Sequence, residues 1–417
     1  MRSLLAPHIF YTMDKIKILV VPANDGGCAY YRAWAPFGKL AEKFPEALDI
    51  RFNKNPLGLD EKTGAWQEDF DFEDMKWCDI IFTQNICNFG GEYTARIIGK
   101  AREFKKFIHY DTDDLLTELY EGHRLKGVYE EKGLSDITKF LYNNADLVTV
   151  TQRKFAERVQ EFCGGVLAVV KNCIDYKLEA WNHTKVPHRN KRVVRVGWAG
   201  GIHHEEDVKE FAGIPALVNT RVGRENVEWH FFGKPPLGPN EEKDWQHDVW
   251  QNYKRILLKG FKGARNWFIH SALPSDQYGV MFAHMDIAIA PLQMNAFNDS
   301  KSEIKVAECG RYKVPLIASN VGCYDETIKN GKTGYLIDED ASKRVWVDTL
   351  AKVIKNRSHR EQMGENLHTV TEEYFDMNKV VDHRVGLYIQ SAEMRGYKSL
   401  VEKFNHFFAG KSKIGRA

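Results

Sequence analysis

The chain has 417 residues, of which 43% are hydrophobic and 12% aromatic, and its formal net charge is +2. This length predicts two domains, and the apolar content excludes a largely disordered chain. The near-neutral charge creates no overall positive field that would attract nucleic acid. The seven cysteines show no C-x-x-C spacing, which argues against a zinc site or a disulfide framework. No apolar run reaches the length of a membrane span, so we expect a cytoplasmic protein.

Short apolar runs alternate with helical stretches over nearly the whole chain, after an N-terminal extension at residues 1–14. Buried runs separated by helices indicate parallel sheets with helices on both faces. The predicted strands are, in chain order, Ile16–Val21, Leu48–Phe52, Asp79–Thr83, Lys106–Tyr110, Leu147–Val150, Val166–Val170, Val193–Trp198, Val227–Phe232, Arg255–Lys259, Ile287–Ala290, Pro315–Ser319 and Tyr335–Ile337.

These strands fall into two sets, each of which opens with a strand and a glycine turn. They predict two Rossmann-like domains, at residues 15–181 and 193–375. The segment between them, residues 182–192, is polar and basic and contains Pro187, which is typical of a linker.

The first predicted strand runs into a turn with the sequence N-D-G-G-C-A-Y-Y-R. Gly26 and Gly27 let the backbone approach a ligand closely, and their N–H groups could bind an anion. We assign Gly26, Gly27 and Arg32 to a ligand site and expect one of the two tyrosines in the core. The turn lacks the G-x-G-x-x-G pattern, which argues against a dinucleotide cofactor.

Three carboxylates, Asp111, Asp113 and Asp114, follow the strand predicted at Lys106–Tyr110. Such a group could orient or deprotonate a hydroxyl, or hold a divalent metal. The alternative is a helix cap, with Asp114 stabilised by the helix dipole. Asp111 and Asp113 are our candidate catalytic carboxylates.

The second predicted domain also opens with a glycine turn. Gly200 and Gly201 follow the strand, and His203 comes just before the next helix, so this turn could bind a phosphate. The two adjacent histidines there point in different directions and make a poor zinc site. Further along, Lys262 is a candidate contact for a nucleobase or phosphate, with a solvated surface as the alternative.

Residues 286–334 read as strand, loop, helix and strand. A basic helix start at the carboxyl end of a parallel strand is suited to anions. Lys301 would stabilise negative charge on a leaving diphosphate, and Glu308 could accept hydrogen bonds from a pair of sugar hydroxyls. The other polar candidates of this segment are Ser300, Ser302 and Lys305.

Taken in order, the first glycine loop, the acidic loop, the second glycine loop and the basic helix resemble those of retaining GT-B-type glycosyltransferases. The loop G-G-C-A-Y-Y-R is most similar to that of phage-encoded and bacterial members. The resemblance implies an α/β GT-B fold, with two Rossmann-like domains facing a central cleft and C-terminal helices at residues 376–417 that cross back onto the first domain. In this family Glu308 would hold the donor's ribose, and a second glutamate usually stands where this chain has Ser300.

The same resemblance implies transfer of a sugar from a nucleotide-diphosphate sugar to an acceptor hydroxyl, with retention of configuration. No cofactor is required beyond this co-substrate, and a divalent metal is not expected, because the helix dipole and basic side chains neutralise the diphosphate.

Several acceptors remain open. The phage-like loop favours a hydroxymethylated base in double-stranded DNA, modified in the host cytoplasm, and basic residues recur at 185–195, 254–265 and 398–416. Such a base would have to be flipped out of the duplex, and a net charge of +2 is modest for a duplex binder. The alternatives are a glycan or lipid-linked saccharide acceptor, a sugar-nucleotide epimerase, or a non-catalytic protein that binds nucleotide sugars.

Overall fold

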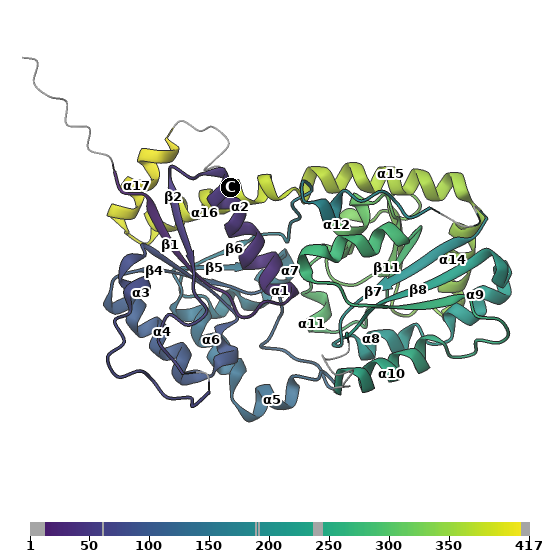
Figure 1. The fold of residues 1–417 in the computed structure, drawn as a ribbon, viewed down its shortest axis with the longest axis horizontal. Coiled ribbons are helices and arrows are strands. Elements are labelled where there is room, and N and C mark those ends of the chain that lie inside the picture. Colours follow the sequence, from purple (N-terminus) through teal and green to yellow (C-terminus); the bar gives the residue numbers. More distant parts are fainter. Residues whose placement is uncertain (1–12, 61, 188–189, 191, 237–244, 410–417) are drawn as a thin grey trace, which may run out of the picture.

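The computed structural model describes residues 13–60, 62–187, 190, 192–236 and 245–409. Two α/β domains lie side by side, each built on one six-stranded sheet (Figure 1). The predicted two-domain α/β fold is therefore confirmed. The N-terminal extension lies mostly outside the described residues.

The first sheet is wholly parallel, with the strand order β2-β1-β3-β4-β5-β6. The register sets Gln84 opposite Asp111 and so brings the carboxyl ends of β3 and β4 to one edge. Its strands are β1 (Ile16–Val21), β2 (Leu48–Phe52), β3 (Ile80–Gln84), β4 (Phe107–Asp111), β5 (Leu147–Val150) and β6 (Val166–Val169).

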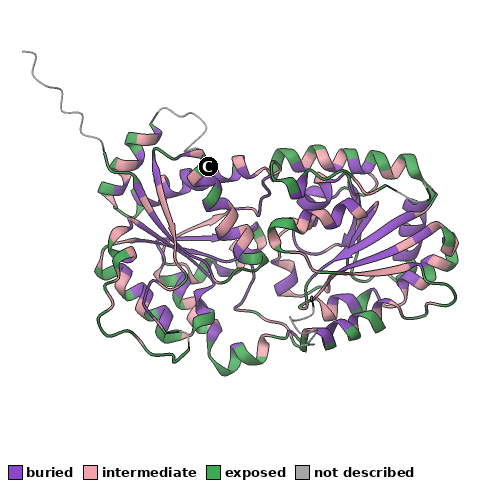
Figure 2. Ribbon diagram, viewed as in Figure 1, coloured by how far each residue is buried: buried purple, intermediate pink, exposed green. Residues whose placement is uncertain are grey.

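The helices of this domain cover both faces of the sheet, which buries most of β1 and all of β3, β4 and β5 (Figure 2). Burial on both faces is why these strands are continuous apolar runs without alternation. The helices are α1 (Gly27–Ala29), a π-helical turn (Tyr30–Trp34), α2 (Ala35–Lys43), α3 (Glu73–Trp77), α4 (Gly91–Glu103), α5 (Lys126–Glu131), α6 (Leu134–Asn144) and α7 (Arg153–Val159), with short 3₁₀ turns at Ile86–Phe89, Gln160–Phe162 and Glu179–Trp181.

The second sheet is also parallel, with the order β12-β11-β10-β7-β8-β9. Its strands are β7 (Val194–Ala199), β8 (Val227–Lys234), β9 (Trp267–Ser271), β10 (Ile287–Ala290), β11 (Leu316–Ser319) and β12 (Gly334–Ile337). Its helices are α8 (Glu205–Glu210), α9 (Ile214–Val222), α10 (Trp245–Leu257), α11 (Ala296–Asp299), α12 (Ile304–Arg311), α13 (Tyr324–Thr327), α14 (Lys343–Lys355) and α15 (Arg357–Tyr374), with 3₁₀ turns at Arg224–Asn226 and Ser275–His284.

One predicted strand is wrong. Arg255–Lys259 begins in the last turn of α10, and the strand of this unit is β9. Val249, Trp250, Tyr253 and Leu257 are buried at intervals of one, three and four residues, which is the periodicity of a helix face. The apolar run at the end of that face is too short to distinguish helix from strand.

The chain returns to the first domain after α15, as predicted from the resemblance. Helices α16 (Met377–Met394) and α17 (Lys398–Phe408) lie over the first sheet, at the upper left of Figure 1. Val381, Tyr388 and Phe404 join the core formed by β1 and α2. Among the described residues, no helix is both long and apolar enough to cross a membrane.

Ionic contacts close the two domains on each other. Lys154 of α7 lies 2.9 Å from the Asp299 carboxylate at the end of α11. Lys171, after β6, pairs with Glu303, and Arg124 lies 2.5 Å from Glu205 of α8. The loops at the carboxyl ends of both sheets therefore meet, and the candidate site lies at this junction.

Candidate functional site

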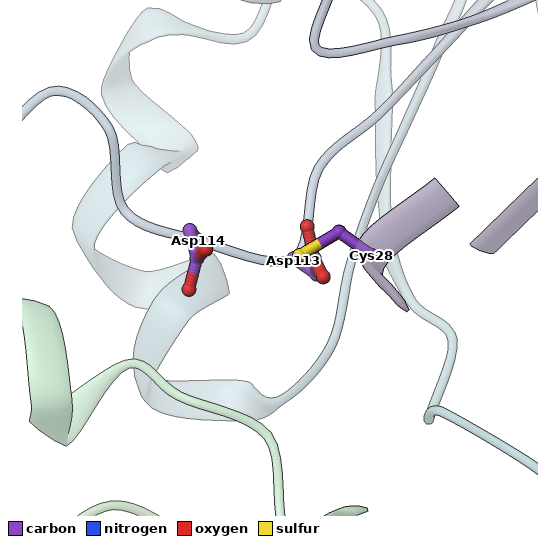
Figure 3. Close-up of side chains that lie close together, drawn as sticks. All are labelled: Cys28, Asp113 and Asp114. Atoms are coloured by element: carbon purple, nitrogen blue, oxygen red, sulfur yellow. The ribbon is translucent and has the colours of Figure 1, made fainter. Parts of the chain in front are cut away.

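The loops after β1 and β4 bring a thiol and two carboxylates together at the junction (Figure 3). Cys28 reaches from α1 towards Asp113, and Asp114 follows on the same loop. One ligand atom from each lies within 4.8 Å of the others, and among the described residues no other group of three could hold a metal ion in this way.

The environment of this group raises two pKa values. Burial, followed by the negative charge of Asp114, raises the pKa of Asp113 from 3.8 to about 6. The charge of Asp113 in turn raises the pKa of the Cys28 thiol, so the sulfur stays protonated at neutral pH. A carboxyl group that titrates near pH 6 is suited to accept a proton or a hydrogen bond from a substrate hydroxyl.

Asp111 does not belong to this group, which corrects its assignment as a catalytic residue. It is fully buried, and its two oxygens accept bonds of 2.8 and 2.6 Å from Arg32. Thr149 donates to the same carboxylate at 2.5 Å, and Arg384 of α16 approaches to 3.8 Å. Burial alone would raise the pKa of Asp111, but the charge of Arg32 and the hydrogen bonds from it lower this pKa below its ordinary value.

Arg32 is therefore a structural residue as well. Its side chain is fully buried, and it also donates to the carbonyl of Val170 at 2.6 Å and to the side-chain oxygen of Asn172 at 3.0 Å. Because the side chain is buried and all three of its guanidinium nitrogens donate to these partners, Arg32 is not available to a ligand, contrary to the prediction.

Of the predicted glycines, Gly27 and Gly201 keep a place at the junction, whereas the amide of Gly26 already donates to the side-chain oxygen of Asn24 at 2.7 Å. Gly26 and Gly27 are exposed at the start of α1, and a Cβ on Gly27 would come within 3.9 Å of Ser275 in the other domain. Gly201 is exposed after β7. The amide of Gly200, in contrast, donates to the carbonyl of Phe232 at 3.2 Å, so it cannot also bind a phosphate.

Lys301 faces the acidic loop from the other domain. Its Nζ lies 3.5 Å from Asp114 and 4.6 Å from the centre of the Phe297 ring. Burial opposes its charge, but the carboxylates of Asp114 and Asp207 hold its pKa above the ordinary value. Lys301 is therefore a fixed cation beside the carboxylates.

Two histidines from opposite domains stack next to this lysine. The rings of His123 and His203 are nearly parallel, with centroids 6.1 Å apart. Burial lowers the pKa of both, that of His123 to about 4, and the neighbouring Lys301 acts in the same direction. Both are neutral at physiological pH and can donate or accept a hydrogen bond.

The helix predicted to begin with Lys301 starts only at Ile304, so Lys301 and Ser302 lie before it while Lys305 and Glu308 lie on it. The chain forms α11, leaves the helix at Ser300 and starts α12 only at Ile304. Ser300 is fully buried and donates to the carbonyl of Ala296 at 2.9 Å, so it cannot reach a ligand. Ser302 accepts a bond of 2.9 Å from Asn172 and links the two domains.

Glu308 lies on α12 with only 1% of its surface exposed. One carboxylate oxygen accepts from Lys305 Nζ at 2.8 Å, and the other accepts from the hydroxyl of Tyr31, in the first domain, at 3.0 Å. Lys305 also lies 3.0 Å from the hydroxyl of Tyr278. Lys305 and Lys301 thus engage different partners.

Lys262 lies away from the junction, which corrects its assignment as a donor contact. It is exposed in the loop that precedes β9, and its carbonyl accepts from Arg224, in the turn before β8, at 2.7 Å. These are the amino ends of the strands, whereas the candidate site is at their carboxyl ends. The error follows from the misplaced strand at Arg255–Lys259.

The sequence did not indicate Cys28, His123 or Tyr278 as site residues, and it predicted one of Tyr30 and Tyr31 in the core without deciding which of the two faces the ligand site. Cys28 and Tyr31 lie in the glycine loop that the sequence did single out, so their position was a usable signal. His123 and Tyr278 carry no motif, and only the folded chain brings them to Lys301 and Lys305.

Comparison with known proteins finds a family match in the second domain and solved structures of similar fold. Residues 254–369, which include α12 and Glu308, match the family model described as glycosyl transferases group 1. The match spans less than half of the chain and lies within the second domain and α15. No curated protein sequence matches the chain.

Solved structures of similar shape span both domains. Sucrose-phosphate synthase from Thermosynechococcus elongatus has a TM-score of 0.62 at 12% identity, covering 92% of this chain and 100% of its own. HepE from Anabaena, in complex with UDP-glucose, has a TM-score of 0.57 at 14% identity and the same coverage. A glycosyltransferase from Rickettsia africae has a TM-score of 0.54 at 15% identity, covering 95% of this chain and 100% of its own. At such identities the likeness establishes the GT-B fold.

Proposed function

We propose that this protein is a glycosyltransferase that moves a sugar from a nucleoside-diphosphate sugar to an acceptor hydroxyl at the junction of its two domains. The observation that carries the proposal is Glu308, a buried carboxylate on α12 inside the segment that matches the group 1 glycosyl transferases. The UDP-glucose bound to the similar HepE structure supports a nucleotide-sugar donor.

In this proposal Glu308 binds the ribose of the donor. Lys301 and the amide of Gly201 stabilise the charge that develops on the departing diphosphate, and His203 donates a hydrogen bond to it. Asp113 accepts a hydrogen bond from the acceptor hydroxyl and orients it for attack. Retention of configuration follows from the resemblance to retaining GT-B enzymes and is part of the proposal.

For the acceptor, we propose a saccharide hydroxyl in preference to a base in DNA. Three described residues of the basic stretches that favoured DNA lie off the junction: Lys262 is at the amino edge of the second sheet, Arg195 lies 3.3 Å from Asp286, and Lys403 lies 2.7 Å from Asp79. The junction itself presents the carboxylates of Asp113 and Asp114. Carboxylates bind sugar hydroxyls well and repel backbone phosphates, which supports an uncharged acceptor.

Substituting Glu308 by Gln should weaken the binding of UDP-glucose about 10- to 100-fold, because a charged hydrogen-bond acceptor is lost at the ribose. Isothermal titration of both proteins measures this difference. Gln preserves the shape of the buried side chain and keeps an amide oxygen that can accept from Lys305, whereas Ala would remove both oxygens from this position. Glu339→Gln, at an exposed position, is the control and should bind as the unchanged protein does. Equal affinities for Glu308→Gln and the unchanged protein would remove Glu308 from the donor site.

Lys301→Ala should lower turnover about 100-fold, since a cation aimed at developing charge acts mainly in the transition state. Donor affinity should change much less. Steady-state rates of nucleoside-diphosphate release, measured with and without EDTA, test this. Loss of activity in EDTA, with recovery on adding Mg²⁺, would show instead that Cys28, Asp113 and Asp114 bind a metal that does this work.

A further inference from the structure

The hydroxyl of Tyr31 is hydrogen-bonded to Glu308, the carboxylate that we propose binds the donor. Tyr31 belongs to the π-helical turn of the first domain, yet its hydroxyl lies 3.0 Å from Oε1 of Glu308 on α12. The other oxygen of Glu308 is bonded to Lys305 at 2.8 Å, so both oxygens are engaged. Tyr31 is the partner that comes from the opposite domain.

The direction of this hydrogen bond is fixed. Burial, followed by the charge of Glu308, raises the pKa of Tyr31 well above its ordinary value, so the phenol keeps its proton and donates. A ribose hydroxyl would make the same kind of bond to the same carboxylate oxygen. The tyrosine hydroxyl and the sugar hydroxyl are therefore equivalent in chemistry.

Given the proposed function, we infer that Tyr31 is a gate of the donor site: its hydroxyl stands in for a ribose hydroxyl on Glu308 and must be displaced when the nucleotide binds. The gate sets donor affinity and makes binding depend on the ribose hydroxyls.

The backbone at Tyr31 is held in place, whereas its ring is only partly enclosed and packs against the core of the second domain. Arg32, the next residue, is anchored by Asp111, Val170 and Asn172. The Tyr31 ring is half-buried and meets Tyr30 edge-on, with centroids 5.4 Å apart. Rotation about the Tyr31 side-chain bonds would free Glu308 without disturbing the ion pair between Arg32 and Asp111.

Removing the hydroxyl should therefore strengthen donor binding. In ligand-free Tyr31→Phe, this Glu308 oxygen has no hydroxyl to accept from. When UDP binds, the ribose hydroxyl supplies that hydrogen bond, and no tyrosine bond has to be broken first. We expect UDP to bind Tyr31→Phe about tenfold more tightly than it binds the unchanged protein. 2′,3′-Dideoxy-UDP has no ribose hydroxyl to compete for Glu308, so the Tyr31 hydroxyl keeps its bond when this ligand binds, and the two proteins should bind it equally.

The experiment is isothermal titration of UDP, ADP, GDP and TDP into the unchanged protein, followed by UDP and 2′,3′-dideoxy-UDP into Tyr31→Phe and Tyr31→Met. Tyr30→Phe, which removes the neighbouring hydroxyl, is the matched control and should leave affinity unchanged. Folding of each variant is checked by circular dichroism.

Equal or weaker UDP binding by folded Tyr31→Phe and Tyr31→Met would overturn the gate while leaving the proposed function standing. Failure of the unchanged protein to bind any of the four nucleotides would overturn the proposed function, and the gate with it.

Discussion

Replacing Asp113 by Asn should make the protein more stable at neutral pH and should abolish sugar transfer. The folded-state pKa of this buried carboxyl is raised from 3.8 to about 6, so the folded protein holds the proton more tightly than the unfolded chain does. The free energy of unfolding then falls as the pH rises from about 4 to about 6. Above this range the ionised Asp113 lowers it by the full amount, about 3 kcal/mol. Asn carries no charge and removes this loss of stability.

Urea unfolding of both proteins between pH 4 and pH 8 measures this effect. The difference in unfolding free energy should be near zero at pH 4 and largest above pH 7. Transfer by the unchanged protein should rise as the pH passes about 6, because ionised Asp113 is the active form. Asp69→Asn, at an exposed position, is the control and should show no such pH dependence. An Asp113→Asn protein that keeps full transfer activity would exclude Asp113 from the reaction.

Asp111→Ala should have the opposite effect on stability and cost about 3–5 kcal/mol, because it leaves buried cations without their counter-charge. Arg32 would lose both of its bonds to the carboxylate, and Arg384 would lose its nearby anion. Guanidinium denaturation at pH 7 is the measurement. The double substitution Arg32→Met with Asp111→Leu should recover the part of the loss that comes from Arg32, since replacing a buried ion pair by apolar groups is often neutral, whereas Arg384 remains without its anion.

Glu121→Ala provides a comparison at the surface, where the carboxylate pairs with Lys126 in solvent. This variant should not move the denaturation midpoint. If Asp111→Ala kept the stability of the unchanged protein but lost transfer activity, Asp111 would have to be returned to the reaction.

The strands were predictable because burial on both faces makes each one a compact apolar run. β1, β2, β5 and β10 have the predicted bounds, and the resemblance correctly implied the return of the C-terminal helices. The strand at Arg255–Lys259 failed because a run of five residues cannot reveal that it continues a helix face.

The roles within the acidic loop could not be read from its sequence. Asp111 and Asp113 stand two residues apart, and either could have been the active carboxylate. Their difference comes from Arg32 and Arg384, distant in the chain, which enclose one of them, and from Asp114, whose charge raises the pKa of the other. Similarly, the helix is broken after Ser300, next to the contacts of Asp299 with Lys154 and Gly322, which are distant in the chain and which no local pattern reports.

The most direct test of the proposed function is a transfer assay read by mass spectrometry. The unchanged protein and Glu308→Gln are incubated with a panel of UDP-, ADP-, GDP- and TDP-sugars, each with free saccharides, unmodified DNA or hydroxymethylated DNA. We predict that one donor is consumed only with a saccharide, that the saccharide gains the mass of one sugar per nucleoside diphosphate released, and that Glu308→Gln loses most of this activity. Sugar added to hydroxymethylated DNA alone would contradict the proposed acceptor. A donor that binds without being consumed by any acceptor would contradict the proposal that this protein is a glycosyltransferase.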